Sequence, residues 1–144
     1  MKNGALVALV ATLAVAPTLV HAENLASDEC HYRASFNCAT ADDAQSRAIC
    51  SSHELMSADC AMGYAYRDAR ALPGANPNER LRKEQRKWVA TRDATCAGRS
   101  GAALTACLGA ETEKRLRWLI EHYKLPVSGK IYEPYKDAKP SSPK

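Results

Sequence analysis

Four polar side chains fall on or beside the apolar stripes of three predicted helices, and these residues could do chemistry together. Stepping 100° per residue places Gln85 and Arg92 in the stripe of one helix. Asp59 and Arg115 fall near the stripes of two others. A buried carboxylate facing guanidinium groups can form an active site, because such groups shift one another's pKa. More often such a cluster is structural, since a buried charge persists only when it is paired. We therefore predict a structural polar network of Asp59, Gln85, Arg92 and Arg115.

The sequence shows no general base or nucleophile that could act together with this cluster. No histidine has a helical spacing that would let it act as a base, and no serine stands in a nucleophile elbow. His31 falls in a predicted arm, His53 at a helix start, and His122 near a helix end, where a cation suits the helix dipole. A metal site would need these histidines brought together with free thiolates. We predict that the protein is not an enzyme and that it has no catalytic residues, metal or cofactor.

The six cysteines give the strongest signal in the sequence, and all of them come after residue 22. An even number in an exported chain favours three disulfides. Neither CxxC nor CxxCH occurs, which leaves a thioredoxin-like redox site, a zinc ribbon and c-type haem without support. Disulfides Cys38–Cys50 and Cys96–Cys107 would each close a loop of about a dozen residues. Each would stabilise the fold by about 3 kcal/mol. Six cysteines allow many pairings, but locality favours Cys38–Cys50, Cys96–Cys107 and Cys30–Cys60.

Helical periodicity predicts the elements that position these groups. Helices are expected over about residues 41–50, 53–71, 79–96 and 101–123. The first would start at Thr40 in a capping-box-like pattern with Asp43, and Asn78 can cap the third. Prolines and glycines in 73–78 and 98–101 break the chain between helices. No strand-type alternation stands out, so the predicted class is all-α, a small disulfide-stapled bundle of about four helices.

Two segments are expected to lie outside the bundle. Residues 23–37 show no clear period and should form an extended N-terminal arm that carries Cys30. Cys60 points off the apolar stripe of its helix, so an arm passing over the outside of that helix could reach it. Prolines, lysines and serines dominate residues 126–144, which we predict to be a flexible C-terminal tail. The helical domain is therefore expected to occupy residues 23–125.

The N-terminus is typical of a signal peptide. Lys2 provides a positive start, residues 5–19 form an apolar run, and residues 20–22 form a small-x-small cleavage site. The run is too short and too near the start to predict a membrane span. Glu23 rather than cysteine follows the cleavage site, which argues against a lipoprotein. We predict signal peptide 1–22 and a soluble periplasmic protein with no stable membrane insertion after cleavage.

The charge is divided unevenly along the chain. Residues 23–79 carry nine acidic and four basic side chains, whereas residues 80–144 carry seven and fifteen. The small and mixed net charge gives no support for a nucleic-acid partner. Solvated helix faces account for most of these charges. If the acidic half binds a protein partner, the candidate contact residues are Asp42, Asp43, Glu54 and Asp68.

An ordered set of motifs extends across residues 35–120. The first half contributes Ser35-Phe36-Asn37-Cys38, Arg47-Ala48-Ile49-Cys50, Glu54-Leu55, Asp59 and Tyr66. The second half contributes Gln85-Arg86, Trp88, Arg92-Asp93, Cys96, Cys107-Leu108, Arg115 and Leu119. In this order the motifs resemble the exported LprI-like lysozyme-inhibitor family. Thr112 stands where family members often have a second aromatic residue. Cys30 and Cys60 look like an added bridge, and the lipid anchor of the family's namesake is missing.

The resemblance implies a small helical, disulfide-bonded domain of the bacterial envelope. For the namesake it also implies binding and inhibition of host-type lysozyme. We therefore predict a periplasmic protein that inhibits lysozyme-type cell-wall hydrolases by occlusion through a protein–protein interface. The alternative is a binding module or immunity-type protein for another secreted hydrolase, with no effect on host lysozyme. Inhibition would distinguish the two, because only the first reading requires a loss of lysozyme activity.

Overall fold

The computed structural model describes residues 30–73 and 77–137. The predicted signal peptide, the first residues of the arm and residues 138–144 lie outside this part. The helices are α2 (Ala44–Cys50), α3 (His53–Ala71), α4 (Pro77–Cys96) and α5 (Gly101–Tyr123). Two short 3-10 helices, η1 (Cys38–Thr40) and η2 (Glu133–Tyr135), flank them. Since the described residues contain no strand, the all-α class is confirmed.

The helix boundaries follow local capping chemistry. α3 and α5 span the expected ranges, and Ser52 caps α3 by accepting a hydrogen bond from the Leu55 amide at 3.3 Å. α2 begins at residue 44 rather than 41, because Asp43 is its N-cap in place of Thr40. α4 begins at Pro77, so the helix starts one residue before Asn78 and not after it, as the sequence had suggested.

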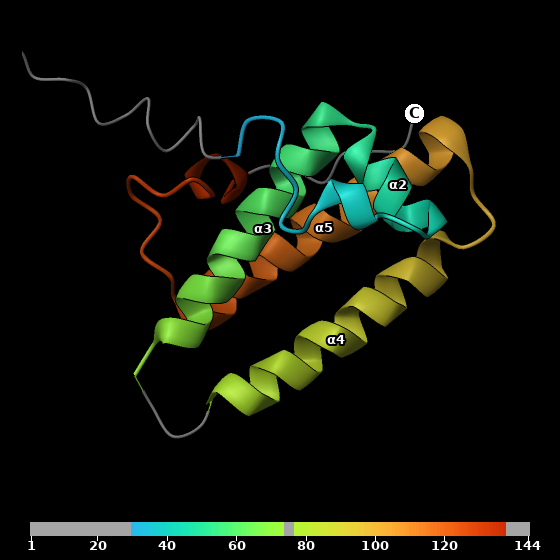
Figure 1. Ribbon diagram of the computed structural model, residues 1–144. Coiled ribbons are helices and arrows are strands. Elements are labelled where there is room, and N and C mark those ends of the chain that lie inside the picture. Colours follow the sequence, from blue (N-terminus) through green and yellow to red (C-terminus); the bar gives the residue numbers. More distant parts are fainter. Residues whose placement is uncertain (1–29, 74–76, 138–144) are drawn as a thin grey trace, which may run out of the picture.

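Two hydrophobic clusters hold the bundle together. At one end α2 packs on the beginnings of α3 and α5, with Ile49, Leu55, Leu104 and Leu108 buried between them. At the other end Met62 and Ala69 of α3 meet Leu81 of α4 and Leu116 and Leu119 of α5. Because the beginnings of α3 and α5 share one cluster and their later turns share the other, these two helices run in the same direction. α4 runs in the opposite direction beside this pair and lies mainly along α5 (Figure 1).

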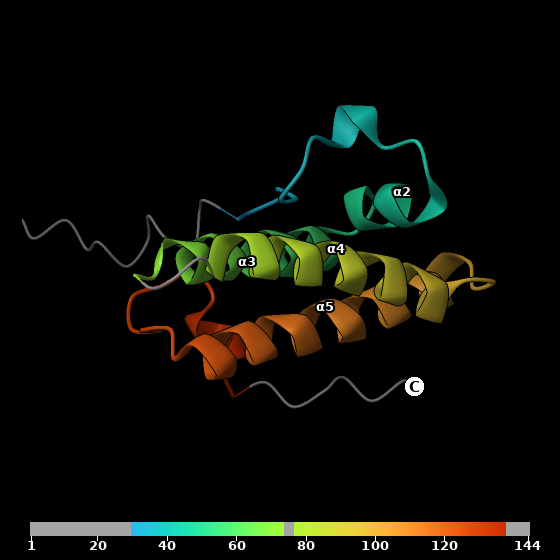
Figure 2. The ribbon, with the colours of Figure 1, turned by 90° about the horizontal axis from the view of Figure 1, so that it is seen from below.

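The elements form three layers. Figure 2 shows the arm and α2 on one side of the layer made by α3 and α4, and α5 with the C-terminal segment on the other. The expected register of α4 is correct, since Leu81, Arg92 and Cys96 are buried and Arg86 is exposed. No described helix combines the length and the apolarity needed to cross a bilayer.

The three disulfides join the expected cysteines. The Cα–Cα distances are 5.5 Å for Cys30–Cys60, 5.7 Å for Cys38–Cys50 and 5.8 Å for Cys96–Cys107. Cys60 is buried although it points off the core stripe, because the arm covers it. The arm is therefore attached to the outer side of α3.

The C-terminal segment is part of the fold. Tyr132 is fully buried, and Val127, Ile131 and Tyr135 pack against the same cluster. The Tyr132 hydroxyl donates a hydrogen bond to Asp68 Oδ2 at 2.8 Å, and Lys130 Nζ lies 3.1 Å from that oxygen. This corrects the expectation of a tail starting at residue 126, since residues 126–137 are packed on α3 and α5. In the sequence, the sign that this segment packs on the bundle was its apolar side chains. They follow no helical period and are separated by proline and lysine.

Candidate functional site

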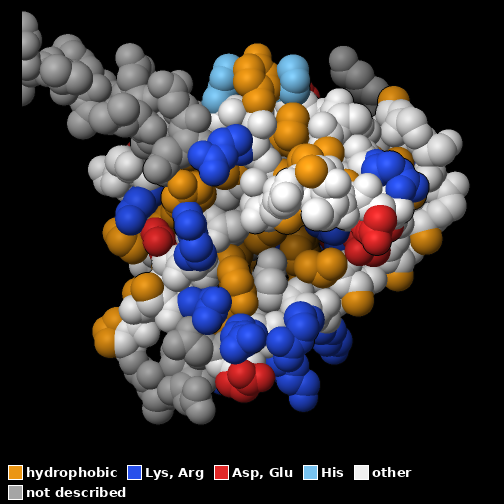
Figure 3. Space-filling model, in the orientation of Figure 1, with side chains coloured by type: hydrophobic (Ala, Val, Ile, Leu, Met, Phe, Trp, Pro, Cys, Tyr) orange, Lys and Arg blue, Asp and Glu red, His pale blue; other side chains and the backbone are white. Residues whose placement is uncertain are grey.

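A cavity of about 570 Å³ opens between the arm, α2, α3 and α4. Figure 3 shows it as a hollow lined by hydrophobic side chains, with lysine and arginine side chains gathered at its edges. Ile49, Met62 and Val89 contribute apolar surface to the lining. Asp59, Gln85 and Arg92 also line it, so the structure brings together three of the four predicted network residues. This cavity is the first candidate site, and its polar groups decide what it can do.

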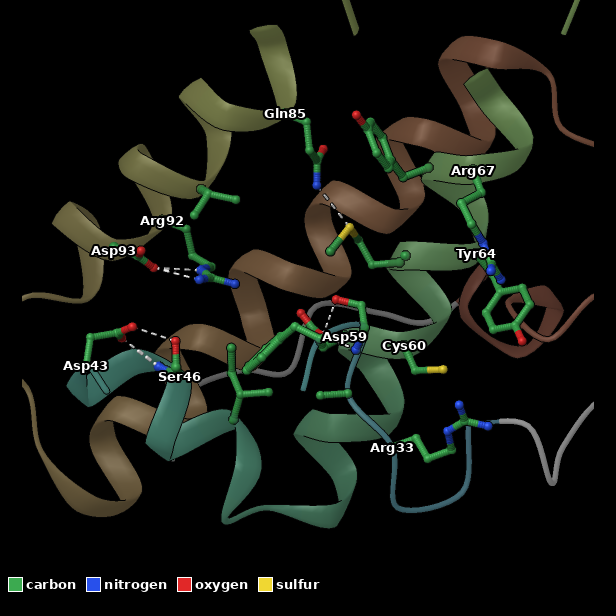
Figure 4. Close-up of a pocket in the computed structure, with 18 residues that line it drawn as sticks. Arg33, Asp43, Ser46, Asp59, Cys60, Tyr64, Arg67, Gln85, Arg92 and Asp93 are labelled. Atoms are coloured by element: carbon green, nitrogen blue, oxygen red, sulfur yellow. Dashed lines mark hydrogen bonds and ion pairs between the residues drawn. The ribbon is translucent and has the colours of Figure 1, made fainter. Parts of the chain in front are cut away.

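Asp59 binds the arm. Its side chain is 2% exposed, and Oδ2 accepts hydrogen bonds from the Ser35 amide at 2.7 Å and the Ser35 hydroxyl at 2.6 Å. Figure 4 shows the carboxylate turned toward the arm residue from α3. A buried carboxylate oxygen needs hydrogen-bond partners, and Ser35 supplies two of them. The expectation that Asp59 faces guanidinium groups is thereby corrected, because its partner among the described residues is Ser35.

Arg92 pairs within its own helix. Its Nε and Nη2 atoms each lie 2.8 Å from Oδ1 of Asp93, the next residue of α4 (Figure 4). The Arg92 side chain is 8% exposed and that of Asp93 is 34% exposed, so the pair reaches from the cavity wall to solvent. The guanidinium carbon also lies 5.3 Å from the centre of the Trp88 ring. Arg92 is therefore held in place by residues of α4 and is not a free cation.

Gln85 and Arg115 connect three helices. Arg115 Nε donates to Gln85 Oε1 at 3.0 Å, and Gln85 Nε2 lies 3.2 Å from the sulfur of Met62. The Arg115 guanidinium sits 4.2 Å from the Trp118 ring centre, and burial lowers the pKa of Arg115. The predicted network thus consists of separate contacts: Asp59 with the arm, Arg92 with Asp93, and Gln85 with Arg115. Each joins or stiffens elements, as expected for structural polar groups.

The four acidic residues considered for partner binding differ in whether their carboxylates are already bonded within the protein. Asp43 accepts hydrogen bonds from the Ser46 amide at 2.7 Å and hydroxyl at 2.5 Å, and these bonds lower the pKa of Asp43. Asp68 is engaged by the C-terminal segment. Asp42 and Glu54 are exposed, and no ion pair of either carboxylate occurs in the described part of the chain. Only these two are free to meet a partner.

Sequence reasoning missed three residues that matter for the site. Ser35 and Asp93 are the partners of Asp59 and Arg92, and Tyr132 fixes Asp68. Ser35 lies in a segment without a period, so no pattern could place it. Asp93 follows Arg92 directly, and neighbours in a helix do not normally face each other. Within residues 30–73 and 77–137, no group of three His, Cys, Asp or Glu could hold a metal ion.

A family model described as Lysozyme inhibitor LprI matches residues 37–119. The chain belongs to this family. The match runs from the start of η1 through most of α5 and includes the disulfides Cys38–Cys50 and Cys96–Cys107. No curated protein and no solved structure matches the chain.

Two described parts of this LprI-family protein lie outside the matched range. One is the arm, residues 30–36, which the Cys30–Cys60 disulfide and the Ser35–Asp59 contact attach to α3. The other is the C-terminal segment, which Tyr132 attaches to the opposite side of the bundle. The family domain is thus extended at both ends, and the buried Asp59 within it serves the N-terminal extension.

Replacing Arg92 with alanine should lower the free energy of unfolding by about 1–2 kcal/mol. The change removes the contact with Asp93 and the packing of the guanidinium against Trp88 and the cavity wall. Replacing the exposed Arg86 should cost about 0.5 kcal/mol or less, since its nearest carboxylate is 4.0 Å away at the surface. Urea unfolding of both variants would check this, and equal losses would contradict the difference in burial.

Proposed function

We propose that the protein is an exported inhibitor of lysozyme-type cell-wall hydrolases that acts by occluding the substrate cleft. The observation that carries the proposal is the match of the Lysozyme inhibitor LprI model over residues 37–119, which include η1, α2, α3, α4 and most of α5. An inhibitor needs a shaped surface and no catalytic groups of its own, and Asp59 and Arg92 of the cavity are engaged in contacts within the protein.

The disulfides support both the mechanism and the location. Three bridges hold α2, the arm and the α4–α5 turn in fixed positions, so the surface loses little conformational entropy when a partner binds. Disulfides persist in oxidising compartments, and together with the apolar N-terminal run they favour the periplasm. A preformed surface of this kind suits a tight stoichiometric inhibitor.

Charge provides a way to steer the encounter. Lysozymes of the common animal type are strongly basic, and an acidic surface on the inhibitor would accelerate association with them. Asp42 and Glu54 are the exposed carboxylates at the starts of α2 and α3. Asp43 and Asp68 add negative charge, but their oxygens are already used within the protein. We therefore assign the steering role to Asp42 and Glu54.

Reversing the charge of Asp42 and Glu54 together, to lysine, should slow association with a basic lysozyme about 3- to 10-fold at low salt. Asp43 is left unchanged because it caps α2. The matched control reverses Lys83 and Lys87, two exposed residues of α4, and should not slow association. Stopped-flow association rates at two salt concentrations would measure both effects. A rate that is unchanged in the acidic variant would remove these carboxylates from the encounter surface.

The function itself is tested with the oxidised chain starting at Glu23 and a panel of lysozymes. Lysis of bacterial cell walls should be inhibited with a stoichiometry near one inhibitor per enzyme. If no lysozyme in the panel is inhibited at low salt, the proposed function is wrong. A pull-down of envelope hydrolases with the same chain would then identify a different secreted enzyme as its partner.

A further inference from the structure

A large aromatic side chain projects from the arm into solvent. Tyr32 is 51% exposed, and its ring centre lies 3.8 Å from that of His31 and 3.9 Å from that of His53. Figure 3 shows two histidine side chains flanking a hydrophobic one at the edge of the molecule. The three rings come from two elements, since His53 is the first residue of α3. They form one contiguous projection, which we call the Tyr32 loop and define as residues 31–34 with His53.

The backbone of this loop is strained. Tyr32 has φ +56°, in the left-handed region that residues other than glycine rarely occupy. Such a conformation costs about 1–2 kcal/mol and persists only when the surroundings enforce it. Tyr32 does not gain this energy back by burial, because half of its surface is exposed to solvent. An exposed side chain held in a strained conformation is a feature of binding sites rather than of cores.

Both ends of the loop are attached to α3. Before it, the Cys30–Cys60 disulfide and a 3.0 Å hydrogen bond from the Ser57 hydroxyl to the Cys30 carbonyl fix the backbone. After it, Ser35 donates two hydrogen bonds to Asp59. Ser35 also lies directly on Gly63, where a Cβ atom would come within 2.8 Å of the Ser35 Cβ. α3 therefore holds the loop at both ends within two turns of helix.

We infer that the Tyr32 loop is a preorganised plug that enters the substrate cleft of the hydrolase, an inference that rests on the proposed function. Tyr32 packs in a sugar-binding subsite, where its flat ring takes the place of a pyranose ring. His31 and His53 supply N–H donors beside it, suited to the carboxylate pair with which glycoside hydrolases cleave their substrates. The loop thereby offers an aromatic surface and hydrogen-bond donors in one rigid unit.

Shape distinguishes the loop from the cavity. A substrate cleft is concave, so the part of an inhibitor that fills it has to project. The cavity between the arm and α4 is itself concave and cannot fill a cleft, whereas the Tyr32 loop projects from the surface. Tyrosine is among the residues that dominate binding energy in interfaces, and a fixed loop loses little entropy on binding. Residues 31–34 of the loop also lie outside residues 37–119, so they would set which hydrolase this family member recognises.

The decisive variant is Tyr32→Gly, because it separates binding from folding. Glycine adopts φ +56° without strain, so the variant should unfold at the same or a higher urea concentration than the unchanged protein. Its inhibition constant for an animal-type lysozyme should nevertheless rise about 30-fold or more. The matched control is Phe36→Ala, which removes another exposed aromatic side chain from the same arm and should change the constant less than about 3-fold.

A competition measurement tests the site of binding on the enzyme. An N-acetylglucosamine trimer, which occupies the lysozyme cleft, should compete with the unchanged protein for the enzyme. If the protein inhibits lysozyme but Tyr32→Gly inhibits equally well, the inferred role of the Tyr32 loop is wrong and the proposed function stands. If the trimer binds together with the inhibitor, the role of the loop is wrong, and inhibition does not occur by occlusion of the substrate cleft. If the unchanged protein inhibits no lysozyme, the proposed function fails, and the plug fails with it.

Discussion

Replacing Tyr132 with alanine should lower the free energy of unfolding by about 3–5 kcal/mol, the cost of removing a buried aromatic side chain. Tyr132 is fully buried in the main cluster, and its loss would leave a hole beside Leu125 and α3. The measurement is urea unfolding followed by circular dichroism. A loss below about 1 kcal/mol would mean that the C-terminal segment contributes little to the fold.

The Tyr132→Phe variant separates the ring from the hydroxyl. It removes the hydrogen bond to Asp68 and should cost about 1–2 kcal/mol. Burial, followed by the hydrogen bond and charge of Asp68, raises the pKa of Tyr132 well above its ordinary value. The stabilisation from this group is therefore complete below pH of about 10, the pKa of an unfolded tyrosine, and is lost as the pH rises further. The phenylalanine variant should lack this alkaline loss of stability.

Replacing both Cys96 and Cys107 with alanine should lower the free energy of unfolding by about 3 kcal/mol through chain entropy. The bridge joins the end of α4 to α5, and α4 depends on α5 for its position because it has few contacts with α3. The alanine pair at Cys38 and Cys50 is the matched control, because the sequence separations are 11 and 12. Cys96 is fully buried, whereas Cys38 and Cys50 are half-buried, so the first pair should cost more by about 1 kcal/mol.

If the free energy of unfolding falls less in the Cys96 and Cys107 variant than in the Cys38 and Cys50 control, the predicted order of the two losses is wrong. That result would mean that packing of Leu81, Trp88 and Arg115 between α4 and α5 holds the helix without its disulfide. Urea midpoints of the two double variants, measured under identical conditions, decide between these outcomes.

The long helices could be predicted because period and capping agree. α3 and α5 each carry an apolar stripe of several turns, and the serines at 51–52 and the glycines around residue 100 mark their starts. The spacing of Ser51 and Glu54 favours Ser51 as the cap of α3, whereas the structure has Ser52 there. The burial of Arg92 and the exposure of Arg86 followed from the same period. α2 has only seven residues, too few for the period to choose between Thr40 and Asp43 as its cap.

The contacts between non-periodic segments could not be predicted. Ser35 and Tyr132 belong to stretches whose conformation is set by what they pack against, and their partners Asp59 and Asp68 lie 24 and 64 residues away. The position of Asp59 near the apolar stripe of α3 could be predicted, but its partner Ser35 could not. Asp68 was expected to be available to a protein partner, and its contact with Tyr132 was not foreseen. The Tyr32 loop was hidden for the same reason, since its strain and exposure arise from attachment at both ends.

The nested order of two disulfides has a consequence for how the chain matures. Cys38–Cys50 lies entirely within the loop closed by Cys30–Cys60. In a chain that crosses a membrane N-terminus first, Cys30 and Cys38 arrive before either of their partners. An oxidase that joins cysteines in order of arrival would link these two and trap the arm away from α3. Correct maturation then requires a thiol–disulfide exchange that releases Cys30 for Cys60, so the yield of native protein depends on an isomerase as well as an oxidase.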